Sequence, residues 1–501
     1  MLLSTAAQIR EADRIQIEEK QVPGILLMEQ AGRMAALKIN ELYPSHMSFL
    51  VLAGPGNNGG DGLVIARYLH LAGKEVQVLL SHEPERYKGD ALINHRILSE
   101  LPVPLLLYTE DDLDEVLASF DQTPLLIDAL LGTGIRDPLR GTVAEIIGRL
   151  ATRPNPVIAI DLPSGLDADT GEQINPVLVA VHTLTFQLPK ICHYVTPAAN
   201  TCGQVHVLDI GIWPEVIDQL NIRRSLITHA FLRKHYRPRN KDAHKGSYGH
   251  VLMVGGSRFM PGAVALATYA ASCAGAGLVT AFTPEVCRQS VSSLCPEAMC
   301  IFTEGPHLGP RDLAAFDAAL KGKSVVALGP GIGTHPDTLA FLTQALPMIQ
   351  VPLVLDADGL NLLASHPELW LSLPDPVILT PHPGEMARLT GRNNINERRL
   401  EAAERLAQDR NVILVLKGAG TLVALPDGRT YVNTTGNPGM ASGGSGDVLT
   451  GILAACLAQG YPAEVAAPLG VFLHGKAGDL AAQQVGMEGV TARRIAEGVR
   501  W

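Results

Sequence analysis

Short runs of Val, Ile and Leu recur along the chain, and each ends in Gly, Asp or another small or polar residue before a helix-like segment begins. Runs that are apolar at every position predict strands buried on both faces, as in a parallel sheet covered by helices. The expected strands of the first half are Ser48–Ala53, Glu75–Leu80, Pro124–Asp128, Pro156–Asp161, His206–Ile210 and Gly211–Pro214. Those of the second half are His250–Gly256, Leu278–Phe282, Ser324–Gly329, Pro352–Asp356, Pro376–Thr380 and Val412–Lys417. The pattern predicts the α/β fold class, with three layers (αβα) in each domain.

The alternation stops between residues 222 and 249, where the chain becomes basic and polar. A chain of 501 residues exceeds the size at which single cores stop growing, so two or more domains are expected. We place the boundary near residue 225 and interpret the basic stretch as a solvated linker rather than an anion-binding edge. The predicted domains are residues 1–220 and 225–501. They share an architecture class without a readable sequence repeat.

Composition narrows the kind of partner. A net charge of −10 and an aromatic content of 5% argue against a nucleic-acid binder, which needs clustered Lys and Arg. The uncharged stretch Val264–Phe282 approaches transmembrane length, but Gly275 and Gly277 split it into a small-residue helix and a strand, so no membrane span is expected. The seven cysteines form no Cys-x-x-Cys pair, which favours a reducing, cytoplasmic location. Small-molecule partners are therefore favoured.

A glycine-rich segment, Gly54–Gly62, follows the strand Ser48–Ala53 and precedes the expected helix Leu63–Leu71. Backbone amides in such a turn can close on a phosphate at the positive end of the helix. The segment matches neither the dinucleotide fingerprint nor the Walker motif. A tight turn alone would need fewer glycines, so we interpret the segment as part of a ligand site.

Two further strand ends carry carboxylates, Asp128 and Asp161, and Asp128 is followed by Gly132-Thr-Gly134. An aspartate at a strand end is often only the cap of the next helix. Ligands of open α/β sheets, however, bind beyond the carboxyl ends of the strands. Three such ends with polar residues therefore favour one common crevice.

Together, Asn57–Asp61, Gly132–Gly134 and Asp161–Gly171 resemble the epimerase domain of the NAD(P)H-hydrate repair enzymes, over residues 1–220. The resemblance implies a Rossmann-like fold and the substrates NADHX and NADPHX, nicotinamide cofactors hydrated at C6, whose R and S forms are interconverted. It implies Asp161 as the catalytic acid/base, and a K⁺ ion held by Asn58, Asp128 and Ser164. The implied substrate contacts are Asn57, Asn58, Gly59, Gly60, Asp61, Gly132, Thr133, Gly134, Ile135, Arg136, Asp137 and Pro138.

The second half has its own glycine-rich turn, Gly443–Asp447, before the apolar segment Val448–Leu457. Other polar or glycine-rich motifs follow the expected strands: Gly255–Ser257 with Gly262–Ala263, Gly329–Gly333, Asp356–Asn361, Thr380–Glu385 and Lys417–Thr421. Together they resemble the ribokinase-like fold over residues 225–501, and within it the ADP-dependent NAD(P)H-hydrate dehydratases.

This second resemblance implies Asp447 as the catalytic base, with the turn's amides forming an anion hole for the transferred phosphoryl group. ADP would be the co-substrate, and Mg²⁺ would offset its charge, with ligands that the motifs leave open. The implied hydrate contacts are Ala263, Gly331, His382 and Asp447, although His382 between two prolines could instead shape a loop. The implied nucleotide contacts are Lys417, Gly418, Ala419, Gly420, Thr421 and Gly446.

The two resemblances predict a bifunctional enzyme that epimerises R- and S-NAD(P)HX and dehydrates the S form to NAD(P)H, giving AMP and phosphate from ADP. Two alternatives remain at this point. One is a ribokinase-like small-molecule kinase with a nucleotide-sensing first domain. The other is a first domain that serves as an RNA-linked scaffold, which would predict loss of Asp161 or of Asn57–Asp61, and both are present. We expect a homo-oligomer, because closed assemblies are common among such enzymes.

Overall fold

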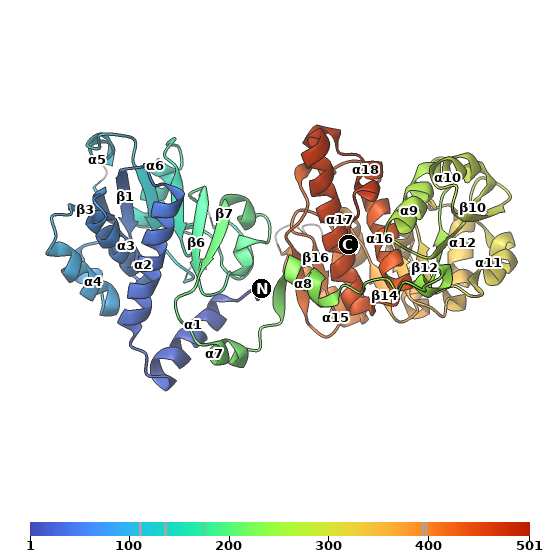
Figure 1. The fold of residues 1–501 in the computed structure, drawn as a ribbon, viewed down its shortest axis with the longest axis horizontal. Coiled ribbons are helices and arrows are strands. Elements are labelled where there is room, and N and C mark those ends of the chain that lie inside the picture. The colour runs from blue at the N-terminus through green and yellow to red at the C-terminus, as the bar shows by residue number, and fades with distance from the viewer. Residues whose placement is uncertain (110–112, 135–137, 175, 393–394, 396–397) are drawn as a thin grey trace. The chain divides into compact units, whose positions relative to one another are not determined.

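The computed structural model describes residues 1–501 apart from 110–112, 135–137, 175, 393–394 and 396–397. The chain divides into two compact units (Figure 1). Leu2–Arg223 form the first unit, and Arg224–Trp501 together with Met1 form the second unit.

The first unit contains a seven-stranded parallel sheet in the order β3-β2-β1-β4-β5-β6-β7. Its strands are β1 Ser48–Ala53, β2 Glu75–Leu80, β3 Leu105–Leu107, β4 Leu125–Ala129, β5 Val157–Ile160, β6 His182–Phe186 and β7 Gln204–Leu208. Its helices are α1 Ala6–Arg14, α2 Gly24–Leu42, α3 Asn57–Leu71, α4 Gly89–Ser99, α5 Leu113–Ala118, α6 Gly141–Leu150 and α7 Pro214–Gln219.

Strand β1 shows why this sheet lies between two helical layers. Its six residues are all buried, and successive side chains point to opposite faces. Phe49 and Val51 pack in one core with α2 and α3, whereas Leu50 and Leu52 pack in another with α5 and α6. The apolar run in the sequence therefore corresponds to a strand covered on both sides.

The second unit contains a ten-stranded sheet in the order β11-β10-β9-β12-β13-β14-β15-β16-β17-β8, antiparallel only where β16 meets β15 and β17. Its strands are β8 Arg224–Ile227, β9 His250–Val254, β10 Leu278–Pro284, β11 Met299–Thr303, β12 Val325–Leu328, β13 Leu353–Leu355, β14 Val377–Leu379, β15 Ile413–Leu416, β16 Leu422–Ala424 and β17 Thr430–Asn433. Its helices are α8 His229–His235, α9 Pro261–Cys273, α10 Arg288–Leu294, α11 Leu313–Leu320, α12 Pro336–Ala345, α13 Asp358–Ser365, α14 Pro383–Thr390, α15 Arg399–Arg410, α16 Ser445–Ala458, α17 Ala463–Val485 and α18 Ala492–Glu497.

The two faces of this sheet carry different cores. On one face α9 and α16 approach closely, because a Cβ on Gly451 of α16 would lie 2.2 Å from the carbonyl oxygen of Ala267 in α9. Elsewhere Phe282, Phe316 and Phe341 form an aromatic cluster that joins β10 to α11 and α12. The predicted α/β class with helical layers is confirmed in both units.

Two local expectations are wrong. Gly211–Pro214 is not a strand, because Gly211 has a φ of 85° and Pro214 is the first residue of α7, a position that suits proline. The basic stretch is not simply a linker, because Arg224–Ile227 forms β8, which pairs in parallel with β17. Arg224 is neutralised there by Glu404, with Nε 2.7 Å from Oε1. Because Arg224 is charged, the sequence pattern did not predict this edge strand.

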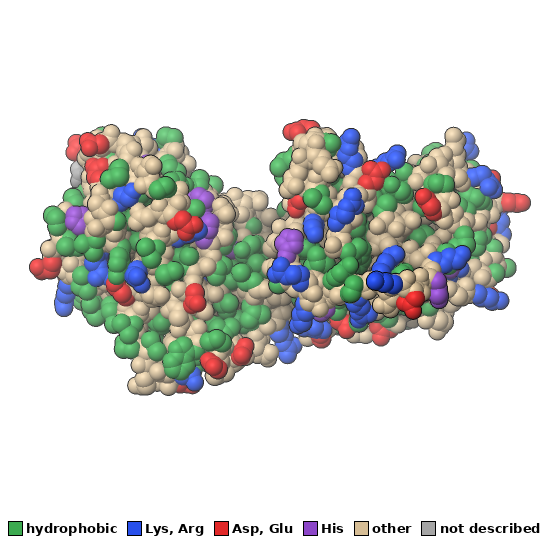
Figure 2. Space-filling view, viewed as in Figure 1, with side chains coloured by type: hydrophobic (Ala, Val, Ile, Leu, Met, Phe, Trp, Pro, Cys, Tyr) green, Lys and Arg blue, Asp and Glu red, His purple; other side chains and the backbone are tan. Residues whose placement is uncertain are grey.

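The uncharged stretch Val264–Phe282 contains parts of α9 and β10, which confirms the predicted division into a helix and a strand. Among the described residues, no helix is long and apolar enough to cross a membrane. On the face drawn in Figure 2, Lys and Arg side chains are interspersed with Asp and Glu over both units.

Candidate active sites

The glycine-rich segment of the first unit continues into α3, which begins at Asn57 rather than at the expected Leu63. A Cβ on Gly59 would lie 1.7 Å from the carbonyl oxygen of Gly54, and one on Gly62 would lie 2.7 Å from Ala129 Cβ. The glycines therefore let the helix start against the ends of β1 and β4. In the sequence they resembled a loop because glycine is a poor helix former.

A cavity of about 500 Å³ opens beside this turn. Seven of the expected ligand contacts line it, namely Asn57, Asn58, Asp61, Gly132, Thr133, Gly134 and Asp161. Gly59 and Gly60 are buried, whereas Pro138 is exposed. Ile135, Arg136 and Asp137 lie outside the described residues. Asp13, Gln187 and Lys190 also line the cavity and were not anticipated.

Asp161 is held at the cavity wall by neighbours from β6 and from the segment that follows it. The buried ammonium group of Lys190 forms an ion pair with its carboxylate and donates to Thr185 Oγ1 at 2.8 Å. The Thr185 hydroxyl donates in turn to Asp161 Oδ1 at 3.1 Å. These two contacts fix the position of the Asp161 carboxylate.

His193 fixes the backbone of the same residue. Its Nδ1 accepts a hydrogen bond from the amide of Lys190 at 3.0 Å, so the proton lies on Nε2, which donates to the Asp161 carbonyl oxygen at 2.9 Å. Burial lowers the pKa of His193 to about 4, so the ring stays neutral. Asp161 has a φ of 66°, in the left-handed region.

Asp61 and Asp13 line the same cavity, and the pKa of each is raised. Burial raises the pKa of Asp61 well above its usual range, and the negative charges of Asp161 and Asp13 raise it further. Burial also raises the pKa of Asp13 to about 6, against the opposing effect of Lys190. The two carboxyl groups therefore have opposite surroundings, because Asp161 pairs with a buried ammonium group whereas burial and two neighbouring carboxylates raise the pKa of Asp61.

The three expected K⁺ ligands form one buried cluster behind the cavity. Asp128 Oδ1 accepts from the hydroxyl of Ser164 at 2.7 Å, and its Oδ2 accepts from the Ser164 amide at 2.8 Å. Burial raises the pKa of Asp128 despite these bonds. Within the described residues, the buried Asn58 Oδ1 has no hydrogen-bond partner. This all-oxygen set, with an unpartnered oxygen and a carboxylate, fits a hard monovalent cation.

In the second unit a buried ion pair connects three strand ends. Lys417, directly after β15, has its Nζ 2.7 Å from Asp356 Oδ1 and 3.7 Å from Glu385 Oε2. The hydroxyl of Thr450 in α16 donates to Asp356 Oδ2 at 2.6 Å. Burial alone would raise the pKa of Asp356. The charge of Lys417 and the hydrogen bonds to the carboxylate outweigh burial and hold this pKa below its usual value. Lys417 is thereby fixed as a cation.

The second glycine-rich turn brings Asp447 to this pair. Helix α16 begins at Ser445, after Gly444 with a φ of 88°, so Asp447 lies in its first turn. A Cβ on Gly446 would lie 3.4 Å from Lys417 Nζ. Burial, aided by the charge of Asp356, raises the pKa of Asp447 to about 7 against the effect of Lys417. A carboxylate with such a pKa is suited to accept a proton near neutral pH.

Arg399 holds the backbone of the expected nucleotide loop, Lys417–Thr421, by hydrogen bonds. This buried side chain donates to the carbonyl oxygen of Ala419 at 2.9 Å and to that of Lys417 at 3.1 Å. The Thr421 hydroxyl donates to the carbonyl oxygen of Gly418 at 2.8 Å. Sequence reasoning missed Arg399 because it lies in α15, outside any motif, and a buried arginine has no local sequence signal.

The four expected hydrate contacts come from two helix starts and two segments after strands: Ala263 lies in α9, Asp447 in α16, Gly331 after β12 and His382 after β14. Gly331 and Ala263 are neighbours, because a Cβ on Gly331 would lie 3.0 Å from Ala263 Cβ. His382 caps α14, with its Nδ1 accepting from the amide of Gly384 at 3.0 Å. Its Nε2 lies 3.5 Å from Glu385 Oε1, beside Lys417. His382 therefore shapes its loop, as in the alternative interpretation, and still borders the Asp447 cluster.

Comparison with known proteins supports a division into two functional parts. A family described as NAD(P)H-hydrate dehydratase matches residues 251–500, and one described as YjeF-related protein N-terminus matches residues 24–192. The bifunctional NAD(P)H-hydrate repair enzyme of Moorella thermoacetica is 42% identical over 98% of this chain and 94% of its own length. That of Escherichia coli is 35% identical over 96% of this chain and 91% of its own. A solved ribokinase-like superfamily protein from Enterococcus faecalis aligns with a TM-score of 0.50 and 29% identity over 55% of this chain and 93% of its own.

Proposed function

The chain belongs to the family of bifunctional NAD(P)H-hydrate repair enzymes, and we propose from this premise that its first unit epimerises the hydrate and its second unit dehydrates it. The family relation supports this function over the small-molecule kinase. The observation that carries the division of labour is the chemistry of the two sites. The first site places a carboxylate that pairs with a buried ammonium group near a second carboxyl group, Asp61, whose pKa is raised. The second site places a buried lysine beside a carboxyl group, Asp447, whose pKa is about 7.

In the first unit, Asp161 is the proton acceptor and Asp61 the proton donor. Changing the configuration at C6 requires a C–O or C–N bond of the hemiaminal to break and re-form on the other face. Either route needs a proton for the departing group and an acceptor for the proton of the group that attacks. Two carboxyl groups whose surroundings favour opposite protonation states supply both.

Lys190, Thr185 and His193 are positioning residues in this mechanism. Lys190 and Thr185 hold the carboxylate of Asp161 by an ion pair and a hydrogen bond, and His193 donates to its carbonyl oxygen. Asn58, Asp128 and Ser164 would hold a K⁺ ion, which would place a fixed positive charge beneath the substrate. Asn57, Gly132, Thr133 and Gly134 border the space in which the substrate binds.

In the second unit, Asp447 accepts the proton of the C6 hydroxyl as that oxygen attacks the β-phosphorus of ADP. The bond between this phosphorus and the bridging oxygen breaks, and AMP leaves with the electron pair. The new phosphate ester then leaves C6 as a proton leaves C5, which forms the double bond of NAD(P)H. Phosphorylation makes a hydroxide-like leaving group into phosphate, and this explains why the reaction consumes a nucleotide.

Lys417 and the amides at the start of α16 oppose the charge that is transferred. The N-terminus of a helix favours anions, and Gly446 leaves the Lys417 ammonium group open to a phosphate. Asp356, Asp358 and Glu385 lie within electrostatic reach of Asp447. Their oxygens suit Mg²⁺, which would neutralise diphosphate charge. Ala263, Gly331 and His382 would border the hydrate, and Gly418–Thr421 the nucleotide.

A direct test mixes the protein with a mixture of R- and S-NADHX and ADP, and follows nicotinamide absorbance together with AMP release. We expect both epimers to be converted to NADH, with one AMP formed per NADH. Absence of NADH formation would overturn the proposed function. Replacing ADP by ATP, and NADHX by NADPHX, measures the preference for each substrate. A homo-oligomer and a cytoplasmic location stay predictions.

A further inference from the structure

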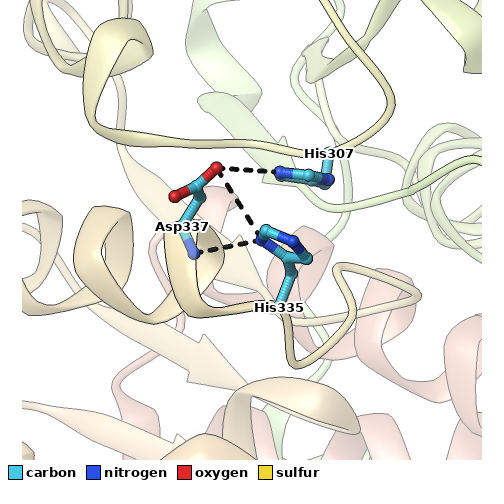
Figure 3. A group of neighbouring side chains, drawn as sticks. All are labelled: His307, His335 and Asp337. Carbon is cyan, nitrogen blue, oxygen red and sulfur yellow. Dashed lines mark hydrogen bonds and ion pairs between the residues drawn. The ribbon is translucent and has the colours of Figure 1, made fainter.

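The second unit carries a group of two histidines and one aspartate that the two reactions do not use. His307 lies in the segment after β11, His335 caps α12, and Asp337 lies in the first turn of that helix. Figure 3 shows the three side chains turned toward one another. Among the residues that the structure describes, this is the only group of three or more His, Cys, Asp or Glu side chains with ligand atoms close enough to share a metal ion.

One nitrogen of each histidine lies near the same carboxylate oxygen of Asp337. His307 Nε2 lies 3.2 Å from Asp337 Oδ2, and His335 Nδ1 lies 3.8 Å from the same oxygen. The two imidazole rings stack with centroids 3.9 Å apart and an interplanar angle of 26°. All three ligand atoms lie within 4.8 Å of one another, so small side-chain movements would bring them around one ion.

The scaffold under this cluster is already fixed. Leu308, next to His307, is buried, and its carbonyl oxygen accepts from the hydroxyl of buried Thr338 at 3.2 Å. Thr338 follows Asp337, so this bond joins the two segments that carry the ligands. The amide of Asp337 donates to His335 Nδ1 at 3.1 Å, so this nitrogen carries a lone pair. When a metal ion binds, His335 Nδ1 would give up this hydrogen bond and coordinate the ion instead. The backbone of both segments would need little further ordering.

The ligand types indicate which ion would bind. Two imidazoles and one carboxylate suit Zn²⁺, Co²⁺ and Ni²⁺, and leave positions for water. Mg²⁺ prefers oxygen ligands, so the Mg²⁺ of the nucleotide would not compete well here. The side chains of His335 and Asp337 are 51% and 59% exposed, so an ion could enter from solution.

The cluster also lies where two loops of the second unit meet. His335 follows Gly329–Gly333, the segment that contains Gly331. The carbonyl oxygen of Pro306, beside His307, accepts from the amide of Arg258 at 2.9 Å, in the loop that leads from β9 to Ala263. An ion held by both histidines would therefore link the segment after β11 to the start of α12, beside both loops.

We propose that His307, His335 and Asp337 form a binding site for a divalent transition-metal ion of the Zn²⁺ type, which fastens the segment after β11 to α12. The site does not depend on either proposed reaction. Its role is structural: the ion would hold the segment after β11 and the start of α12 in one arrangement, without catalysing a reaction.

The test measures Zn²⁺ alone on the untagged full-length protein after removal of metal by a chelator. Equilibrium dialysis should show one bound equivalent, with binding at least about tenfold weaker in His307→Asn and in His335→Asn. Asparagine is a favoured helix cap, so His335→Asn removes the ligand and keeps the cap of α12. His366→Asn, outside the cluster, should bind as the wild type does.

Two outcomes would overturn the proposal: no bound equivalent in the wild type, or equal binding in the wild type and both variants. The cysteines are a possible competing site, and Co²⁺ distinguishes them, because thiolate ligands would give an intense charge-transfer band that this site would lack. Amide hydrogen exchange tests whether the bound ion fastens the segment after β11 to α12. Zn²⁺ should slow exchange in residues 304–309 and 332–338 of the wild type alone. Unchanged exchange in the metal-bound wild type would overturn the fastening role.

Discussion

At the scale of single residues, Asp61 and Asp161 show how two identical carboxyl groups in one cavity can have opposite surroundings. Asp161 has a buried ammonium group and a hydroxyl beside it, whereas Asp61 has burial and two neighbouring carboxylates. In the proposed mechanism, the same residue type therefore serves as an acceptor at one wall and as a donor at the other.

Asp13 gives a way to test this assignment. Above a pH of about 6 Asp13 is mostly ionised, and its charge helps to raise the pKa of Asp61. In Asp13→Asn the pKa of Asp61 should fall, so the donor loses its proton at a lower pH. We expect the alkaline side of the epimerase pH–rate profile to move to lower pH, measured by chromatography of the two NADHX epimers. Asp121→Asn, on an exposed turn, is the control, and an unmoved profile would contradict the role of Asp61.

Asp447 is tested by removing its proton-accepting oxygen. Asp447→Asn should lower the kcat of ADP-dependent dehydration by about 10²–10⁴, the usual contribution of a general base, and leave epimerisation intact. Single-turnover assays with S-NADHX and ADP measure the effect. Asp409→Asn, at an exposed position of α15, should be unaffected. Wild-type dehydration in Asp447→Asn would show that another group is the base.

The pH dependence of dehydration follows from the raised pKa of Asp447, about 7. The base works only in its ionised form, so kcat should fall as the pH drops through about 7. An unburied aspartate would keep its activity down to a pH of about 4. Profiles of kcat in overlapping buffers would locate this acid limb. A limb at the ordinary aspartate value would exclude Asp447 as the group that titrates.

Residues inside motifs could be identified from the sequence, and residues outside them could not. Asp161, Asp128 and Asp447 stand at strand ends or in glycine-rich turns, where position alone suggests chemistry. Lys190 and Arg399 lie outside such turns, and only the folded chain brings them to the sites. Their roles depend on long-range contacts that leave no periodic or local pattern.

At the scale of elements, both glycine-rich segments are helix starts. The apolar runs predicted β1, β2, β9 and β12 closely, because most residues of these strands are apolar and buried. Strands β6, β8 and β17 contain threonine, histidine or arginine, and their sequences did not distinguish them from loops. The starts of α3 and α16 were set too late, since close packing against neighbouring backbone overrode the low helix propensity of glycine.

Gly59 tests this packing explanation. Its Cβ would lie 1.7 Å from the backbone of Gly54, so Gly59→Ala should destabilise the first unit by about 1–3 kcal/mol, as overpacking does. Gly148→Ala is a matched control within α6, because its Cβ meets nothing within 4 Å. It should be neutral or stabilising by up to about 1 kcal/mol. Urea unfolding of both variants gives the comparison, and equal stabilities would contradict the packing role.

At the scale of the whole molecule, the chain joins two reactions with different stereochemical demands. Dehydration of the S form alone would leave the R form to accumulate, and the epimerase site supplies the missing step. Because the two sites lie in separate units, each should be removable without loss of the other.

Asp161→Asn should therefore convert the S half of a mixed NADHX pool at the wild-type rate and then slow to the rate of spontaneous epimerisation. Chromatography of the remaining hydrate should show the R form alone. Adding wild-type protein late in the reaction should restore full conversion. Complete, rapid conversion by Asp161→Asn would mean that epimerisation does not depend on this carboxylate.

The left-handed backbone of Asp161 has a consequence for how this protein would respond to selection. A non-glycine residue with φ of 66° costs of the order of 1 kcal/mol or more, a conformation that glycine adopts without penalty. Asp161→Gly should relieve this strain and abolish epimerisation, but it would also leave the buried ammonium group of Lys190 without its carboxylate. Selection for heat tolerance alone would therefore be expected to replace Asp161 and Lys190 together, rather than the aspartate by itself.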